Sequence, residues 1–173
     1  MSDQPLDALT ISEYLCEVAD ELDDHDSQRT VIVAGGALLA LHGLREATRD
    51  VDSVLQLDKE LQGAVVRVAA RHDLAPKWLN DSAAAFVPAT FNIEDCELIL
   101  DRASLLVLGA PLDQVFLMKL FASRAIDTDD LETLWPHCTF ESPELAVEAF
   151  YAAYPFEEPD RHLAEHLRVI LNL

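Results

Sequence analysis

The feature that most constrains the fold is a short strand pattern that ends at two glycines. Thr30–Ala34 (TVIVA) is a β-branched apolar run, typical of a buried strand, and Gly35-Gly36 follows at once. Ala37–His42 (ALLALH) then has the composition of a short helix that stops at Gly43. A glycine pair between a strand and a helix lets a ligand approach backbone N–H groups at the positive end of that helix.

A pair of aspartates follows the glycines. We expect a strand over Asp50–Leu57, with one face made by Val51, Ser53, Leu55 and Leu57. Asp50 and Asp52 then share the other face, with Cα atoms about 7 Å apart. Two such carboxylates suit Mg²⁺ or Mn²⁺, which take substrate phosphates as further ligands. Either motif alone is weak, since glycine pairs commonly make tight turns and the chain has 32 acidic residues. Their order and spacing together indicate phosphoryl or nucleotidyl transfer.

The rest of the chain reads as two further strands and several helices. The helices that the apolar spacing predicts are Leu9–Leu22, Leu61–His72, Leu112–Ser123, Asp127–Leu134, Pro143–Ala153 and Glu158–Leu171. The strands are Glu97–Leu100 and Leu105–Leu108. This order predicts an α/β (α+β) fold, in which a small mixed sheet is flanked by helices and a helical part follows.

Composition narrows the functional classes. The chain has 173 residues and 12 Lys and Arg against 32 Asp and Glu, a net charge of −20. Such a charge disfavours non-specific binding to nucleic acid. No apolar run is long enough to span a membrane, and the first ten residues lack the pattern of a signal peptide, so we expect a cytoplasmic protein. Three widely spaced cysteines predict neither disulfides nor structural zinc.

Two blocks resemble the signature of the nucleotidyltransferase fold. The first runs from Gly35-Gly36 through Gly43, Arg45 and Thr48 to Asp50-Val51-Asp52. The second, MKLFASRAIDTDDL at residues 118–131, is similar to a helix and acidic turn of the AbiEii-type (MenT-like) nucleotidyltransferases of toxin–antitoxin systems and their small relatives. The resemblance covers residues 28–135. We therefore expect an N-terminal helix at 1–27, a nucleotidyltransferase-like core at 28–135 and a helical segment of the same unit at 136–173.

The resemblance implies a role for each matching residue. Gly35 and Gly36 would hold a nucleoside triphosphate (NTP), with phosphate contacts from Arg45, Thr48 and Arg49. Asp50 and Asp52 would bind Mg²⁺ or Mn²⁺ and align an acceptor hydroxyl for attack at the α-phosphorus. Lys119 would neutralise phosphate charge, and Asp130 or Asp127 would supply a later acidic group.

Plainer structural roles compete with two of these assignments. Lys119 lies in an apolar helix, where an amphipathic lysine commonly extends along the surface. Asp127, Asp129 and Asp130 are also what the first turn of a helix favours.

The sequence departs from the pattern at two points. Ser53 follows the second aspartate where an apolar residue is usual, and no clean motif supplies the third carboxylate that many nucleotidyltransferases carry on a later strand. Glu97 and Asp101 are the candidates for that position.

These observations predict an enzyme that moves a nucleoside monophosphate from an NTP to a hydroxyl on RNA, such as tRNA, or on protein. Within a toxin–antitoxin pair it would be the toxin, with an antitoxin protein or a second copy of the chain as partner. RNA conflicts with the charge of −20 unless Arg45, Arg49, Arg102 and Arg124 cluster around the site. The alternatives are a catalytically degenerate module that acts by nucleotide or protein binding, and a phosphotransferase acting on a small hydroxylated substrate.

Overall fold

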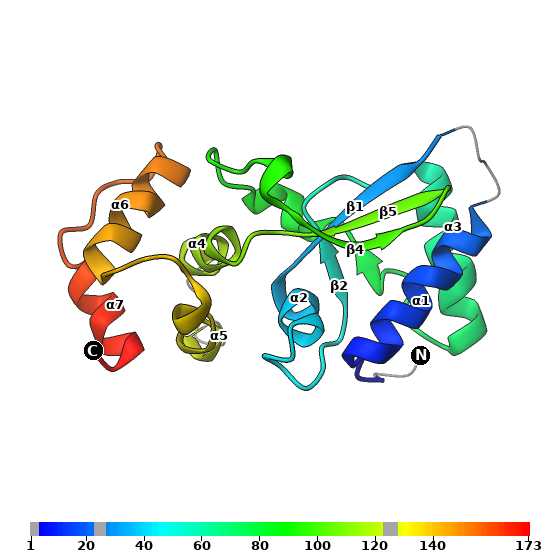
Figure 1. Cartoon of the computed structure of the whole chain (residues 1–173), viewed down its shortest axis with the longest axis horizontal. Helices are drawn as coiled ribbons and strands as arrows, with labels where there is room; N and C mark the ends of the chain where they lie inside the picture. Colours follow the sequence, from blue (N-terminus) through cyan, green and yellow to red (C-terminus); the bar gives the residue numbers. More distant parts are fainter. Residues whose placement is uncertain (1–3, 23–26, 123–127) are drawn as a thin grey trace. The chain divides into compact units, whose positions relative to one another are not determined.

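The computed structural model describes residues 4–22, 27–122 and 128–173 (Figure 1). By their internal contacts the residues form two compact units. Unit 1 consists of Met1–Ala85 and Cys96–Ala110, and unit 2 of Phe86–Asp95 and Pro111–Leu173. The sequence-based division at residues 27/28 and 135/136 follows the extent of a resemblance and stays a prediction. None of the helices within the described ranges is long and apolar enough to cross a membrane.

Unit 1 is built on a mixed sheet whose five strands have the order β3-β2-β1-β5-β4 in the described chain. The central strand β1 (Arg29–Ala34) pairs in parallel with β5 (Leu105–Gly109) and antiparallel with β2 (Val51–Ser53). At the edges, β3 (Leu79–Asn80) is parallel to β2, and β4 (Glu97–Asp101) is antiparallel to β5. The mixed sheet and the α/β class are as the sequence predicts.

Strand register separates the side chains into two faces. Paired residues share a face, so one face carries Asn80, Asp52, Ala34, Ile32, Thr30, Leu108, Leu106, Leu98 and Asp101. We call this the Asp52 face. The opposite face carries Val51, Val33 and Val107, which are fully buried. Leu38 of α2 (Gly35–Leu41) lies over Gly109 on that opposite face.

Two longer helices complete unit 1, α1 (Ala8–Glu21) and α3 (Lys59–His72). Each begins at an aspartate that caps it, because Asp7 accepts a hydrogen bond from the Thr10 N–H and Asp58 accepts one from the Leu61 N–H. The two helices lie side by side (Figure 1). Trp78 is buried and donates its indole N–H to the Val65 carbonyl of α3, so it belongs to the core of unit 1.

Unit 2 is helical. Its α-helices in the described chain are α4 (Leu112–Ala122), α5 (Thr128–Leu134), α6 (Pro143–Ala153) and α7 (Leu163–Leu171). Phe116, Leu134, Phe150 and Leu167 are among its buried side chains. Short 3₁₀ turns occur at Ser82–Phe86, Ile93–Asp95 and Trp135–His137.

Two predicted elements are shorter than the sequence suggested. The strand predicted over Asp50–Leu57 ends at Ser53, because the chain turns there and the Val54 N–H bonds back to the Ile32 carbonyl. Val54 is buried at this turn. The helix predicted from Glu158 starts at Leu163, and a turn held by Asp160, which accepts from the His162 N–H, precedes it.

Candidate functional site

The first glycine of the pair packs against the second aspartate. Gly35 has φ +60°, a left-handed conformation that favours glycine, and it begins α2 directly after β1. A methyl group on Gly35 would lie 3.2 Å from Oδ2 of Asp52. The pairing of Ala34 with Asp52 explains this contact, since the end of β1 stands beside that carboxylate. The two motifs that the sequence singled out are thus neighbours in space.

The second glycine packs against the loop that precedes the aspartates. A methyl group on Gly36 would lie 2.5 Å from Nη1 of Arg45 and 2.8 Å from Oγ1 of Thr48, closer than real side chains approach. Only glycine leaves room for these two side chains here. A guanidinium and a hydroxyl, both hydrogen-bond donors, therefore stand next to the glycine pair.

The loop is held by the N-terminal segment. Thr48 forms a two-way backbone pair with Leu6, with N···O distances of 2.7 and 2.9 Å. Leu6 is fully buried, so its side chain anchors the segment in the core of unit 1. Sequence reasoning assigned no role to the N-terminal segment, because a single bridge leaves no periodic signal.

Asp50 and Arg49 lie at the solvent-facing end of this group. Both are exposed and stand directly before β2, whereas Asp52 is only partly exposed within the strand. Asp52 also makes further interactions within the chain. Gly35, Gly36, Arg45, Thr48, Arg49, Asp50 and Asp52 thus belong to one part of unit 1. We call these seven residues the glycine–aspartate site.

The later site residues belong to unit 2. Nζ of Lys119 on α4 lies 2.6 Å from Oδ2 of Asp130 on α5. Asp130 is only 5% exposed, so this is a largely buried ion pair. The phosphate role of Lys119 and the role of Asp130 as a later acidic group stay predictions. Asp127 and Arg124 lie outside the described residues.

Neither candidate for a third carboxylate stands beside β2. Glu97 and Asp101 begin and end β4, which β5 and β1 separate from β2. Glu97 lies across Gly109 and its Oε1 is 2.5 Å from Nε2 of His42, whereas Asp101 accepts from the Gln28 amide at 2.8 Å. Both carboxylates thus have partners away from the aspartate pair.

The position next to Asp52 is held by an amide. Asn80 on β3 pairs directly with Asp52. Its Oδ1 accepts from the Ser82 N–H at 2.9 Å and its Nδ2 donates to the Lys77 carbonyl at 3.3 Å. The sequence predicts no strand at Leu79–Asn80, because two residues are too few to show alternation.

Ser53, the unusual residue after the aspartates, has a structural role. It is fully buried, and its hydroxyl donates to the Leu55 carbonyl at 2.9 Å while accepting from the Leu55 N–H at 3.1 Å. The hydroxyl therefore holds the turn that ends β2. An apolar side chain at this position could not make either bond.

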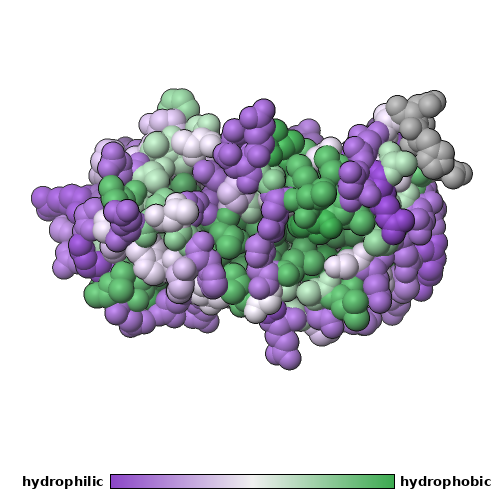
Figure 2. All heavy atoms as spheres, in the orientation of Figure 1, coloured by the Kyte–Doolittle hydropathy of each residue, from purple (hydrophilic) through white to green (hydrophobic). Residues whose placement is uncertain are grey.

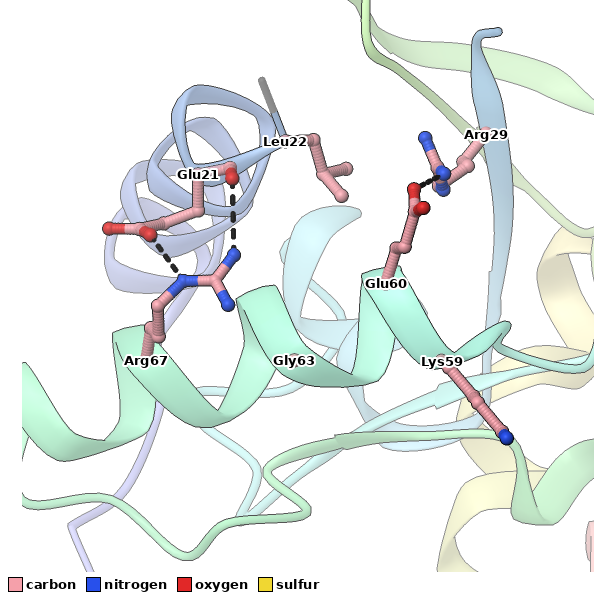
Figure 3. Close-up of a pocket in the computed structure, with 7 residues that line it drawn as sticks. All are labelled: Glu21, Leu22, Arg29, Lys59, Glu60, Gly63 and Arg67. Atoms are coloured by element: carbon pink, nitrogen blue, oxygen red, sulfur yellow. Dashed lines mark hydrogen bonds and ion pairs between the residues drawn. The ribbon is translucent and has the colours of Figure 1, made fainter. Parts of the chain in front are cut away.

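Two hollows lie outside the glycine–aspartate site. In unit 1, a cavity of about 330 Å³ lies between the end of α1 and the start of α3 (Figure 3). Both arginines that line it are paired, Arg67 with Glu21 and Arg29 with Glu60. In unit 2, a largely apolar hollow of about 300 Å³ is lined by residues that include Phe121, Tyr154 and Phe156.

A divalent cation fits the donor set at the aspartates. Within the described ranges no three His, Cys, Asp or Glu side chains gather as a metal cage. Mg²⁺ needs no such cage, because one or two carboxylates commonly hold it while water and phosphates fill its other positions. Asp52 beside Gly35, with Asp50 two residues earlier, provides that minimum.

Comparison with known families identifies a match over most of the chain. Residues 12–143 match the model of the family described as "Nucleotidyltransferase of unknown function (DUF6036)". The match extends through the glycine–aspartate site and both Lys119 and Asp130. Comparisons with curated proteins and with solved structures gave no match.

Proposed function

The chain belongs to the DUF6036 family of nucleotidyltransferases, and on that premise we propose that it transfers a nucleoside monophosphate from an NTP to an acceptor hydroxyl. The observation that carries the proposal is the packing of Gly35 against Asp52 and of Gly36 against Arg45 and Thr48. This packing brings two hydrogen-bond donors suited to phosphate, on Arg45 and Thr48, close to the aspartate carboxylates. A purely structural turn would need neither the donors nor the acids.

Each residue of the glycine–aspartate site has a part in this proposal. The guanidinium of Arg45 and the hydroxyl of Thr48, which lie against Gly36 because it has no side chain, donate to the triphosphate. Arg49, which is exposed, adds positive charge at the solvent-facing end of the site. Asp50 and Asp52 would hold Mg²⁺ or Mn²⁺, which offsets phosphate charge and polarises the α-phosphate when bound.

The transfer balances as a single displacement. The acceptor oxygen forms a bond to the α-phosphorus while the bond from that phosphorus to the β-phosphate oxygen breaks. Pyrophosphate leaves with the bonding electrons, and the hydroxyl proton passes to a carboxylate oxygen of Asp50 or Asp52 and then to water. Lys119 and Asp130 contribute in this proposal by fixing the fold of unit 2, since they neutralise each other.

A matched pair of variants tests the proposal. Asp52→Asn removes a site charge with little change of shape, and Asp20→Asn makes the same change at an exposed position of α1. With α-³²P-labelled NTPs, Mg²⁺ and cell lysate, we expect Asp52→Asn to lower label transfer by about a hundredfold or more. Asp20→Asn should match the wild type. Equal transfer by wild type and Asp52→Asn would contradict the proposal.

A second candidate function rests on Asn80. An amide at the position paired with Asp52, and carboxylates of β4 that two strands separate from β2, favour a degenerate module that binds NTP without transferring it. Titration calorimetry with NTP and Mg²⁺ separates the two functions. Binding that requires Asp52, with no transfer to any acceptor, would identify the module. Transfer with pyrophosphate release would identify the enzyme.

The toxin role is a further part of the proposal. It is supported by the resemblance of residues 28–135 to AbiEii-type toxins. Induced expression should then arrest growth in the wild type and not in Asp52→Asn, and co-expression of a cognate partner protein should restore growth. Growth arrest that Asp52→Asn reproduces would show that toxicity does not come from the transfer reaction.

A further inference from the structure

An exposed apolar surface lies on the same face of the sheet as Asp52. The strand register places Leu108 and Leu98 in one row with Ile32, and Leu106 in the next row. Leu98 is 64% exposed, and Leu106 and Leu108 are partly exposed. Figure 2 shows hydrophobic residues gathered where β4 and β5 of unit 1 lie. We call Leu98, Leu106 and Leu108 the leucine surface.

The packing of helices on the sheet does not explain why these exposed positions carry leucine. The opposite face of β5 carries Leu105 and Val107, which are fully buried. β1 is buried on both faces, since Ile32 and Ala34 of the Asp52 face are as buried as Val31 and Val33, so the exposed apolar part of the Asp52 face lies on β5 and β4. Apolar side chains left exposed together on one face of a domain commonly mark a binding surface.

The charges on this face indicate which kind of ligand can bind to it. Among the strand residues of the described sheet, the charged members of the Asp52 face are Asp52 and Asp101, both acidic. Arg29 pairs with Leu105 and so belongs to the opposite face. A phosphate backbone laid over β5 and β4 would meet the Asp101 carboxylate and the leucines, and no residue within these two strands supplies a cation to this face. A second copy of the chain would bring another net charge of −20.

We propose that the leucine surface binds the acceptor, and that the acceptor is a protein segment with a Ser, Thr or Tyr hydroxyl beside apolar residues. This inference rests on the proposed nucleotidyl transfer at Asp52. Apolar residues of the segment bury the leucines on β5 and β4, while its hydroxyl extends past the buried side chains of β1 to the glycine–aspartate site. The product is a phosphodiester between that hydroxyl and the nucleoside monophosphate, with pyrophosphate released and the hydroxyl proton taken up by Asp50 or Asp52.

The test changes the leucine surface and leaves the nucleotide site intact. Leu98→Asp places a charge on the surface, Leu98→Met keeps it apolar, and Val169→Asp makes the same change at a 72% exposed residue of α7. Each variant is incubated with α-³²P-labelled NTPs, Mg²⁺ and lysate, and the products are treated with ribonuclease or proteinase. NTP affinity and the urea midpoint are measured for every variant.

We expect label that proteinase removes and ribonuclease does not. Leu98→Asp should lower this label about tenfold at unchanged NTP affinity, while Leu98→Met and Val169→Asp match the wild type. Label on RNA, no labelled protein, or equal labelling by Leu98→Asp would overturn the inference. If one of these results occurs and NTP still binds to the wild type but not to Asp52→Asn, only the inference about the acceptor fails. If NTP does not bind to the wild type, the proposed function fails as well.

Discussion

At the scale of single residues, the site depends on which positions can be glycine. Gly35 and Gly43 both have positive φ, at +60° and +71°, but their surroundings differ. A side chain on Gly35 would meet the Asp52 carboxylate, whereas one on Gly43 would meet nothing within 4 Å. Both positions therefore favour glycine because of their positive φ. Only at Gly35 would a side chain also collide with a residue of the site.

This contrast gives the first prediction. Gly35→Ala and Gly43→Ala should each lower the free energy of unfolding by about 1 kcal/mol, because both place a side chain in the left-handed region. Only Gly35→Ala should also weaken Mg²⁺ and NTP binding, since its methyl group displaces Asp52. Urea unfolding and titration calorimetry measure the two effects. Equal nucleotide affinities in the two variants would contradict the placement of the site.

Lys119 and Asp130 give a second prediction. Lys119→Met leaves the buried Asp130 carboxylate without its lysine, so the free energy of unfolding should fall by about 3 kcal/mol. The double variant Lys119→Met/Asp130→Leu removes both charges and should be more stable than the single variant. Urea unfolding of the two variants and the wild type decides this. Unchanged stability in Lys119→Met would favour the direct phosphate role that the sequence suggested.

At the scale of elements, α1 and α3 are joined by a charged cluster. Arg71 bonds Glu17 and Glu21, Arg67 bonds Glu21, and His72 donates to Glu17 at 2.8 Å. Burial raises the pKa of Glu17, but the hydrogen bonds from His72 and Arg71 outweigh it and hold that pKa below the ordinary 4.5. Hydrogen bonds from Arg67 and Arg71 likewise lower the pKa of Glu21.

The cluster predicts an acid-sensitive contact. A lowered folded pKa means that the unfolded chain takes up the proton first, so the stabilisation is full above pH 4.5 and is lost as pH falls through the folded value. Glu17→Gln should thus be less stable than wild type at pH 7, and this difference should shrink below pH 4.5. Glu13→Gln, an exposed change on the same helix, is the control. A difference independent of pH would show that charge is not its source.

Element prediction succeeded where a pattern was long enough to repeat. The helices from Leu61 and Pro143 and the strand at Thr30–Ala34 follow apolar spacing closely. The pattern failed beyond Ser53, because Leu55 and Leu57 continued an alternation that the Ser53 turn interrupts. It also missed β3, so Asn80 beside Asp52 could be found only from strand pairing. The contact of Gly36 with Arg45 and Thr48 likewise depends on a loop path that no local pattern encodes.

At the scale of the whole molecule, charge and surface limit which acceptors the proposed transfer can use. The net charge of −20 works against a polyanionic acceptor, and the leucine surface offers apolar contact in its place. The family match spans parts of both units, from residue 12 to residue 143. The chemistry, however, is proposed for unit 1 alone, because the seven residues of the glycine–aspartate site all belong to that unit.

The central claim is that a nucleoside monophosphate, and not the terminal phosphate, is transferred. The most direct measurement compares α-³²P-labelled with γ-³²P-labelled NTP in parallel reactions with wild type and Asp52→Asn. We predict labelled acceptor from the α-labelled NTP only, with the γ label recovered in pyrophosphate, and neither result with Asp52→Asn. Acceptor labelled from the γ position would identify a phosphotransferase and contradict the account.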